Sequence, residues 1–445
     1  MRASLENNLI AGNIGRAVGR LTFLFLLTYL LENLAVTASM IIIGRYGDAA
    51  ALSAISVGAR VIATALTLCF GFCTSLTAMI ARQIGKAGDN AAMRVIIGNG
   101  AFCMLLLAAG LLCLLVFGSG AIITLMRVPP EAAADARGYL VICGLGIPFI
   151  AGYTYTFAIY NGFGDAKTPM LLMAAACSAN IALAIVLVNY AGMRVAGVAL
   201  AAALAHFICF SFSIFRLRRL RGGIMPSWND LRPRRAVAGE MTKTGLPMIA
   251  YYLLRSASSL IVVAIINTGG LLASAAAGVT ETIINFEFLI PVSVASAVMV
   301  VAAQNLGSGQ AKRAAQATVR GMIFCVLCGA LFCLFCQLMP QFFTDLVTRD
   351  ALVSKTAAVY LQTYSIDCIL AAAAACLNSY FIARGKTGIC MAHMAAAAFL
   401  GRVPFSYIIS RTPGATLWHM GFAAPVSSAI SIAICLFFLC RLKKP

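Results

Sequence analysis

The sequence predicts an all-α polytopic membrane protein with about twelve transmembrane helices. Of its 445 residues, 62% are hydrophobic and 11% are charged, and the mean hydropathy is +0.94. A helix that crosses the hydrocarbon core of a membrane needs roughly 20 apolar residues, so a chain of this length can hold roughly twelve such helices. The apolar runs do not alternate with polar residues, as membrane strands do. Helices are therefore expected, because they satisfy their own backbone in lipid.

Each span is expected where an apolar run lies between charged or Gly/Pro-containing breaks. The first six are expected near residues 16–43, 51–80, 94–119, 138–161, 168–190 and 196–216. The second six are expected near residues 245–268, 274–304, 317–347, 354–382, 388–410 and 418–440. Twelve such helices predict two pseudo-symmetric six-helix lobes.

The longest polar stretch divides the chain almost in half. It predicts an N-lobe at 1–217, a basic cytoplasmic linker at 218–244 and a C-lobe at 245–445. The basic residues around it are Arg216, Arg218, Arg219, Arg221, Arg232, Arg234, Arg235 and Lys243.

The net charge of +19 is explained by topology and predicts no nucleic-acid partner. With a cytoplasmic N-terminus, most basic residues fall on the cytoplasmic side, as the positive-inside rule requires. We therefore expect a multi-pass protein of the bacterial inner (plasma) membrane with both termini cytoplasmic. Contact of the basic linker with anionic membrane lipid is a secondary expectation.

Weak internal repetition supports two lobes. Residues 81–85 (ARQIG) after the second span are similar to residues 303–307 (AQNLG) after the eighth, and Lys167-Thr168 matches Lys386-Thr387. An even number of spans per repeat gives both lobes the same orientation. A pathway between the lobes is the expected consequence.

Several motifs occur in a characteristic order along nearly the whole chain. They are residues 44–47 (GRYG), 50–54 (AALSA), 81–85, 160–170 (YNGFGDAKTPM), 196–199 (AGVA), 245–248 (GLPM), 303–309 and 402–407 (RVPFSY). Together they resemble the MATE (multidrug and toxic compound extrusion) family.

The resemblance implies a V-shaped pair of six-helix bundles that exports cationic and amphipathic drugs in exchange for H⁺ or Na⁺. It implies a small-molecule substrate and no cofactor besides the coupling ion. Three positions where family members carry acids hold Ser39, Ala184 and Arg255 in this chain. The choice between H⁺ and Na⁺ therefore stays open, and we expect a monomer.

Charged side chains within spans are costly, roughly 2.5–3.5 kcal/mol each on insertion scales, and indicate partners, water or function. The acids are Glu32, Glu281, Glu287 and Asp367, and the bases are Arg60, Arg255 and Arg402. The acids are candidates for binding the coupling ion or a cationic substrate. Alternatively, Arg255 and Arg402 form structural ion pairs with Glu287 and Asp367.

Polar and proline residues within the spans add further candidates. Asn180 can offer a neutral oxygen to an ion or substrate, although such residues often bridge helices. Pro247, Pro291 and Pro404 each remove a backbone hydrogen bond and are hinge candidates, although many membrane prolines are static.

The sequence predicts neither an enzyme nor a metal site. Cys325, Cys328, Cys333 and Cys336 have zinc-like spacing, but a helix spreads them too far apart to bind one ion. No complete nucleotide-binding motif is present. The alternative function is a flippase for lipid-linked oligosaccharide, which would need a cationic cavity lined by the span arginines.

Overall fold

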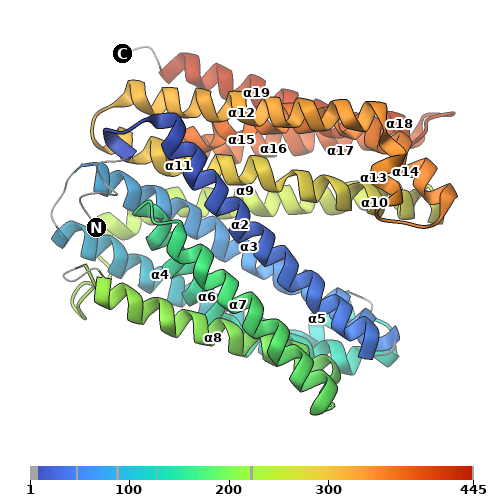
Figure 1. The fold of residues 1–445 in the computed structure, drawn as a ribbon, viewed down its shortest axis with the longest axis horizontal. Helices are drawn as coiled ribbons and strands as arrows, with labels where there is room; N and C mark the ends of the chain where they lie inside the picture. Colours follow the sequence, from blue (N-terminus) through green and yellow to red (C-terminus); the bar gives the residue numbers. More distant parts are fainter. Residues whose placement is uncertain (1–8, 47–48, 87–89, 127, 221–223, 443–445) are drawn as a thin grey trace. The chain divides into compact units, whose positions relative to one another are not determined.

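The computed structural model describes residues 9–46, 49–86, 90–126, 128–220 and 224–442. Every regular element in these ranges is helical (Figure 1). Twelve helices or helix pairs in them are long and apolar enough to cross a membrane. The predicted fold class is therefore confirmed. Gly47 of the first motif and Arg221 of the basic cluster lie outside the described residues.

The chain divides into two compact units. The first unit is Leu27–Ile249, and the second unit is Met1–Leu26 together with Ala250–Pro445. Residues before Leu27 belong to the second unit partly because its side chains bind them. Asn305 donates from Nδ2 to the carbonyl of Leu9 at 3.0 Å, and Arg313 donates from Nη2 to the carbonyl of Gly12 at 2.7 Å. The lobe limits drawn from the sequence stay a prediction.

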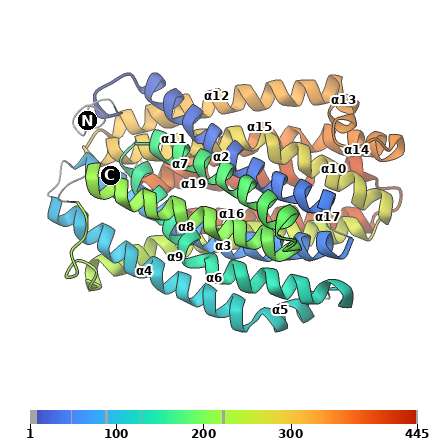
Figure 2. The same cartoon turned by 60° about the horizontal axis from the view of Figure 1, so that its bottom comes forward.

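The first unit takes in most of α2 and the helices that follow it. They are α2 (Ile14–Tyr46), α3 (Ala49–Gly85), α4 (Asn90–Phe117), α5 (Ser119–Leu125), α6 (Pro130–Gly162), α7 (Lys167–Ile185), the π-helical turn η1 (Val186–Tyr190) and α8 (Arg194–Leu220). Helix α6 packs against α3, α4 and α8 (Figure 2). Small residues allow α6 to pack this closely against α3. A Cβ on Gly162 would lie 2.7 Å from the Ile80 side chain, which is too close for a real contact.

The segment between α8 and α9 is held by a buried asparagine of α4. Asn99 donates from Nδ2 to the carbonyl of Asp230 at 3.2 Å and accepts from the amide of Arg234 at 2.8 Å. The Asp230 carboxylate accepts from the amide and hydroxyl of Ser227. These hydrogen bonds lower the pKa of Asp230, with smaller contributions from Arg94 and Arg234. A polar segment is thus folded onto the first unit.

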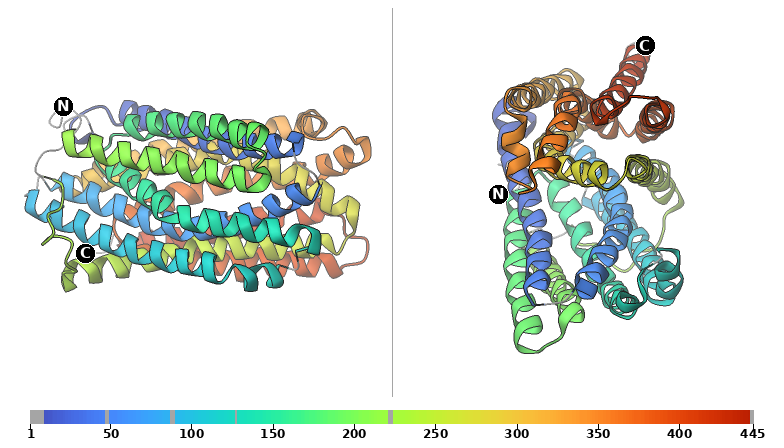
Figure 3. Two further views of the ribbon diagram at one scale, coloured as in Figure 1. Left: turned by 90° about the horizontal axis from the view of Figure 1, so that it is seen from below. Right: turned by 90° about the vertical axis from the view of Figure 1, so that its right-hand side faces the viewer.

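The second unit contains the later helices. They are α9 (Arg235–Asn267, from Ala250), α10 (Leu271–Glu287), α11 (Leu289–Gly307), α12 (Ala311–Leu338), α13 (Pro340–Asp345), α14 (Ala351–Tyr364), α15 (Ile366–Ala383), α16 (Thr387–Ala396), the π-helical turn η2 (Ala397–Arg402), α17 (Val403–Arg411), α18 (Leu417–Met420) and α19 (Ala423–Leu442). Within each unit the long helices run roughly along one direction (Figure 3). Helix α15 packs against α11, α12 and α19.

Several predicted span boundaries were wrong. The predicted span 317–347 ends at Leu338, because Pro340 lacks an amide hydrogen and starts the separate helix α13. The predicted span 354–382 is two helices, α14 and α15, interrupted at Ser365. Helix α9 begins at Arg235 rather than at 245, because a helix continues into polar sequence that an apolar run does not reveal.

Two equivalent helix ends support the internal repeat. Gly164 after α6 and Gly385 after α15 both have positive φ, +77° and +72°. In each case the amide of the residue after the glycine donates to the carbonyl five residues earlier. The amide of Asp165 donates to the carbonyl of Tyr160 at 3.0 Å, and the amide of Lys386 donates to the carbonyl of Phe381 at 2.9 Å. This geometry is a Schellman motif, in which glycine avoids the cost of a left-handed residue. The matched Lys-Thr pairs follow these two turns.

Candidate functional site

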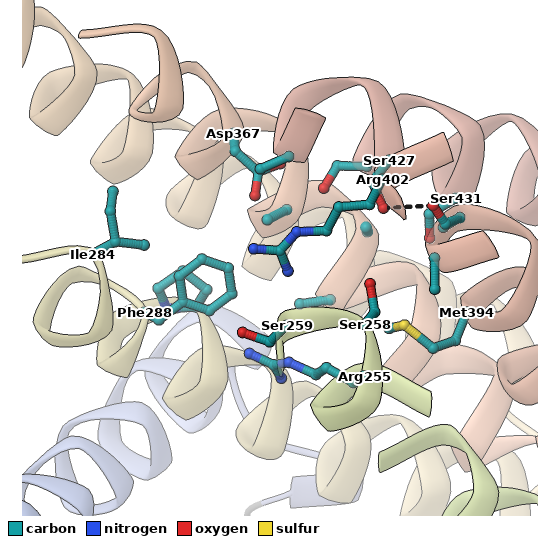
Figure 4. Close-up of a pocket in the computed structure, with 18 of the residues that line it drawn as sticks. Arg255, Ser258, Ser259, Ile284, Phe288, Asp367, Met394, Arg402, Ser427 and Ser431 are labelled. Atoms are coloured by element: carbon teal, nitrogen blue, oxygen red, sulfur yellow. Dashed lines mark hydrogen bonds between the residues drawn. The ribbon is translucent and has the colours of Figure 1, made fainter. Parts of the chain in front are cut away.

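The second unit contains a pocket of about 180 Å³ within its membrane-spanning helices (Figure 4). The lining side chains come from α9, α10, α11, α14, α15, α16, η2 and α19. Four of the seven charged residues predicted within spans line it, namely Arg255, Glu281, Asp367 and Arg402. The fold thus brings together residues that are up to 147 positions apart in sequence, from 255 to 402.

Arg402 is held by two partners. Its Nη2 lies 3.9 Å from Oε1 of Glu281 and donates to the hydroxyl of Tyr364 at 3.0 Å. Its Nε is buried and has no hydrogen-bond partner in the described part of the chain. Arg402 is the last residue of the π-helical turn η2, which precedes Pro404. The charge of Glu281 is therefore offset by Arg402.

Asp367 lies in the first turn of α15, directly after the interruption at Ser365. The residue is 6% exposed, and the Ser428 side chain on α19 acts on its carboxylate as a hydrogen-bond donor, whereas Oδ1 has no hydrogen-bond partner among the described residues. No arginine lies within 4.0 Å of its carboxylate among the described residues, although the charges of Arg402 and Arg255 act on it at longer range. The start of a helix favours a negative charge through the helix dipole. Asp367 is thus available to a ligand.

Glu287 lies beside the pocket rather than in its lining. It is the last residue of α10 and is 6% exposed. Among the described residues, no hydroxyl, amide or guanidinium donates to either carboxylate oxygen, and the neighbouring polar group is the Cys368 thiol. The charge of Asp367 also acts on it. An uncompensated buried carboxylate is costly, so a proton or cation would stabilise it.

Arg255 has no carboxylate partner within 4.0 Å among the described residues. Its side chain is exposed on α9, and its guanidinium carbon lies 5.4 Å from the centroid of the Phe288 ring. The guanidinium therefore stays available at the wall of the pocket.

A buried histidine network in the pocket was missed by the sequence analysis. Nδ1 of His393 lies 2.8 Å from the hydroxyl of Ser431, and Nε2 lies 3.1 Å from Oδ1 of Asn378. Ser427 and Ser428 on the same helix as Ser431 also line the pocket. A signal was present in the sequence, because Ser431 lies three and four residues after Ser428 and Ser427 and therefore neighbours both on the helix surface.

The remaining charged and amide candidates belong to the first unit. Glu32 on α2 and Arg60 on α3 are exposed, and neither has an ion pair within 4.0 Å among the described residues. Asn180 on α7 is buried, and within the described ranges its Oδ1 has no hydrogen-bond partner. The charge of Glu32 acts on the buried Tyr153, whose hydroxyl also has no hydrogen-bond partner.

The predicted hinge prolines occupy three different settings. Pro247 lies inside the continuous helix α9. Pro291 lines the pocket and lies just after the interruption at Phe288 between α10 and α11. Pro404 follows η2 and cannot donate to the carbonyl of Leu400. A fourth proline within a span, Pro148, lies inside α6 and was not among the predicted hinges.

The described residues hold no group of three or more His, Cys, Asp or Glu side chains placed to bind a metal ion. What the pocket offers instead is charge and hydrogen bonding at membrane depth. Ionisable residues there mark ion or substrate pathways. Fold and pocket together define a polytopic helical membrane protein with a charged pocket among its membrane-spanning helices.

Comparison with known proteins identifies the family. The MatE profile matches residues 25–186 and 247–408, one match in each half of the chain. The protein belongs to the MATE family. A solved structure described as the outward-facing conformation of a multidrug resistance MATE transporter of the MOP superfamily is 19% identical. It matches 98% of both chains with a TM-score of 0.91, which shows the shared fold.

Two curated relatives are similar over part of their length. The probable multidrug resistance protein YpnP of Bacillus subtilis is 24% identical over 61% of this chain and 60% of its own. The probable multidrug resistance protein NorM of Aromatoleum aromaticum is 27% identical over 65% of this chain and 63% of its own. The matches thus span less than two thirds of either relative.

Proposed function

We propose that this protein is a secondary active antiporter that exports cationic or amphipathic xenobiotics in exchange for H⁺ or Na⁺. The observation that carries the proposal is Asp367, which lines a pocket inside the membrane-spanning helices and has no ion-pair partner within 4.0 Å in the part of the chain that the structure describes. A proton, a Na⁺ ion and a cationic substrate each offset its charge. If they compete for Asp367, loading one releases another, which is the requirement for exchange.

The other candidate residues take supporting roles in this proposal. Glu287, also without a charged partner, is a second site for the coupling ion beside Asp367. Glu281 and Arg402 form the wall of the substrate site. Glu32 and Asn180 in the first unit are candidates for a separate ion or substrate contact.

Two further observations support a transport cycle. YpnP and NorM are both described as probable multidrug resistance proteins. Helix interruptions at Phe288 and Ser365, and the π-helical turn before Pro404, lie next to pocket residues. Discontinuous helices at binding sites are a common feature of transporters that work by alternating access. We expect a cofactor-free monomer in the bacterial plasma membrane, with both termini cytoplasmic.

The alternative function is a flippase for lipid-linked oligosaccharide. One observation favours it, because Arg255 and Arg402 line the same pocket and could bind a pyrophosphate group. Glu281 and Asp367 line that pocket too, and Arg60 belongs to the other unit. The mixed charge of the pocket favours the antiporter.

The test is transport into inverted membrane vesicles with a proton gradient or a sodium gradient imposed separately. We expect accumulation of ethidium or a fluoroquinolone under one of the two gradients, which would name the coupling ion. Vesicles without the protein are the control. If neither gradient drives uptake although the protein is in the membrane, the antiporter is rejected in favour of the flippase.

A further inference from the structure

The pocket of the second unit keeps one positive and one negative group free of each other. Glu281 and Arg402 pair at 3.9 Å, so their charges largely cancel. Arg255 and Asp367 have no ion pair within 4.0 Å among the described residues, with each other or with another group. The lining contains three other titratable side chains, which add no charge to the pocket when they are neutral, namely Tyr251, Tyr364 and His393. The lining thus offers a separated positive and negative charge, which suits a ligand that carries both signs, and the buried carboxylate of Glu287 beside the pocket adds a negative charge for the coupling ion.

The surroundings of Arg255 favour an anionic group of a planar kind. Ser258 and Ser259 lie three and four residues further along α9, so all three share a helix face. Ser258 is buried, with 2% of the residue exposed, and its hydroxyl has no hydrogen-bond partner among the residues that the structure describes. Ser259 and Arg255 both line the pocket (Figure 4). A guanidinium and free hydroxyls together bind a carboxylate well, since arginine offers two parallel N–H groups.

The size and walls of the pocket favour an aromatic body between the two charges. Its volume is about 180 Å³, and an apolar cavity of about 150 Å³ is known to hold benzene. Phe288 lies at the wall, 5.4 Å from the Arg255 guanidinium carbon. A dianionic phosphate fits less well, because Asp367 faces the same pocket and Arg402 is already paired.

Resting on the function proposed above, we propose that this pocket selects aromatic zwitterions, with Arg255 binding the carboxylate and Asp367 binding the ammonium group. The ammonium group then replaces the coupling ion at Asp367, so exchange is preserved. Arg255 adds selectivity, because a cation without a carboxylate leaves the guanidinium unpaired. A substrate with both charges is therefore preferred over the same molecule with its carboxylate blocked.

The test compares 4-(aminomethyl)benzoate, which carries an ammonium group and an aryl carboxylate on one ring, with its ethyl ester, using the purified full-length protein in detergent. By isothermal titration calorimetry, we expect the acid to bind roughly tenfold or more tightly than the ester. In Arg255→Gln, affinity for the acid should fall to that for the ester, whereas affinity for the ester should not change. Asp367→Asn should weaken binding of both.

A matched control is Arg411→Gln. Arg411 is exposed, lies outside the pocket and has the same ring contact as Arg255, with its guanidinium carbon 5.4 Å from the Tyr407 ring centroid. Both affinities should stay at their wild-type values in this variant. If Arg255→Gln is not folded by size-exclusion chromatography and thermal melting, Arg255→Lys is used, and a partial loss of the preference is expected.

Two outcomes would overturn the inference. One is a wild-type protein that binds the ester as tightly as the acid, and the other is a preference for the acid that survives in Arg255→Gln. Uptake of both compounds into inverted vesicles separates this inference from the proposed function. Gradient-driven uptake without a preference for the acid leaves the antiporter standing and rejects the inference. A binding preference that depends on Arg255, without gradient-driven uptake, rejects the antiporter alone.

Discussion

At the scale of single residues, the second unit contains charges that are only partly compensated. Arg402 pairs with Glu281, whereas Asp367 and Glu287 each keep a carboxylate oxygen without a hydrogen-bond partner. Such groups cost free energy inside a membrane protein unless a ligand or proton offsets them. Their cost is the reason to expect function from these residues rather than from the paired ones.

We expect Asp367→Asn to abolish gradient-driven export while the protein still folds. The amide keeps the size of the side chain but carries no charge that a proton, Na⁺ or cationic substrate can offset. The measurement is the initial rate of ethidium uptake into inverted vesicles under each gradient. Glu131→Gln is the matched control, because Glu131 is exposed in the first turn of α6. Wild-type uptake by Asp367→Asn would remove this residue from the coupling mechanism.

Asp230 predicts a local dependence on pH outside the spans. Hydrogen bonds from Ser227, assisted by Arg94 and Arg234, lower its pKa in the folded state. Its contribution to stability is therefore complete above the pKa of an unfolded aspartate, about 3.9, and is lost as the pH falls through the lower folded pKa. Hydrogen exchange of residues 224–234, corrected for the intrinsic rate, should speed up across this range. In Asp230→Asn, fast exchange should already be present at neutral pH. An unchanged exchange rate in that variant would contradict the role of the carboxylate.

At the scale of elements, the interruptions of regular helix lie near the pocket. Residues Ala397–Arg402 form a π-helical turn, and the missing amide hydrogen of Pro404 leaves the carbonyl of Leu400 without its helical donor. Such turns are often found at functional sites. The turn also contains Arg402, so the geometry of the turn sets the position of the guanidinium that pairs with Glu281.

We expect Pro404→Ala to restore the regular hydrogen bond and to slow transport more than it weakens substrate binding. The physical reason is that a regular helix resists bending where the wild-type segment is already interrupted. Initial transport rates and calorimetric affinities measured on the same preparation test this expectation. Pro148→Ala, within the uninterrupted helix α6, serves for comparison and should change the rate less. Equal rates for Pro404→Ala and wild type would show that the proline is static.

Contact between α12 and α15 predicts a strong effect at Gly329. A Cβ there would lie 2.5 Å from the carbonyl oxygen of Cys368, a backbone atom that cannot move alone. Gly329→Ala should therefore destabilise the protein by about 1–3 kcal/mol through overpacking. Gly110→Ala on α4 is the matched change, because nothing lies within 4 Å of its added Cβ. Thermal melting in detergent should separate the two variants, and equal midpoints would refute the close approach.

At the scale of the whole molecule, the basic residues predict a single orientation in the membrane. Fusion of a fluorescent protein that matures only in the cytoplasm to the C-terminus should give fluorescent cells. Fusion of alkaline phosphatase at the same point should give no activity, because that enzyme needs the oxidising periplasm. The opposite pair of results would reverse the predicted topology and place the linker outside.

The sequence by itself determined the fold class, the number of spans and the family. These depend on hydropathy, on segment length and on short motifs, all of which can be measured along one chain. The repeat was visible for the same reason, through Lys167-Thr168 and Lys386-Thr387, and the structure places both pairs after equivalent glycine turns.

Only the tertiary structure decided which charges meet. Arg402 pairs with Glu281 rather than with Asp367, although Asp367 is closer to it in sequence. The His393 ring contacts the side chains of Ser431 and Asn378. The interruption at Ser365 was also missed, although polar residues from Gln362 to Asp367 surround it, because a polar cluster in a sequence does not distinguish a break in a helix from a polar helix face. The physical reason is that partners are set by the rotation, depth and bending of each helix. Those quantities arise from packing against other helices, and a linear sequence read span by span does not contain them.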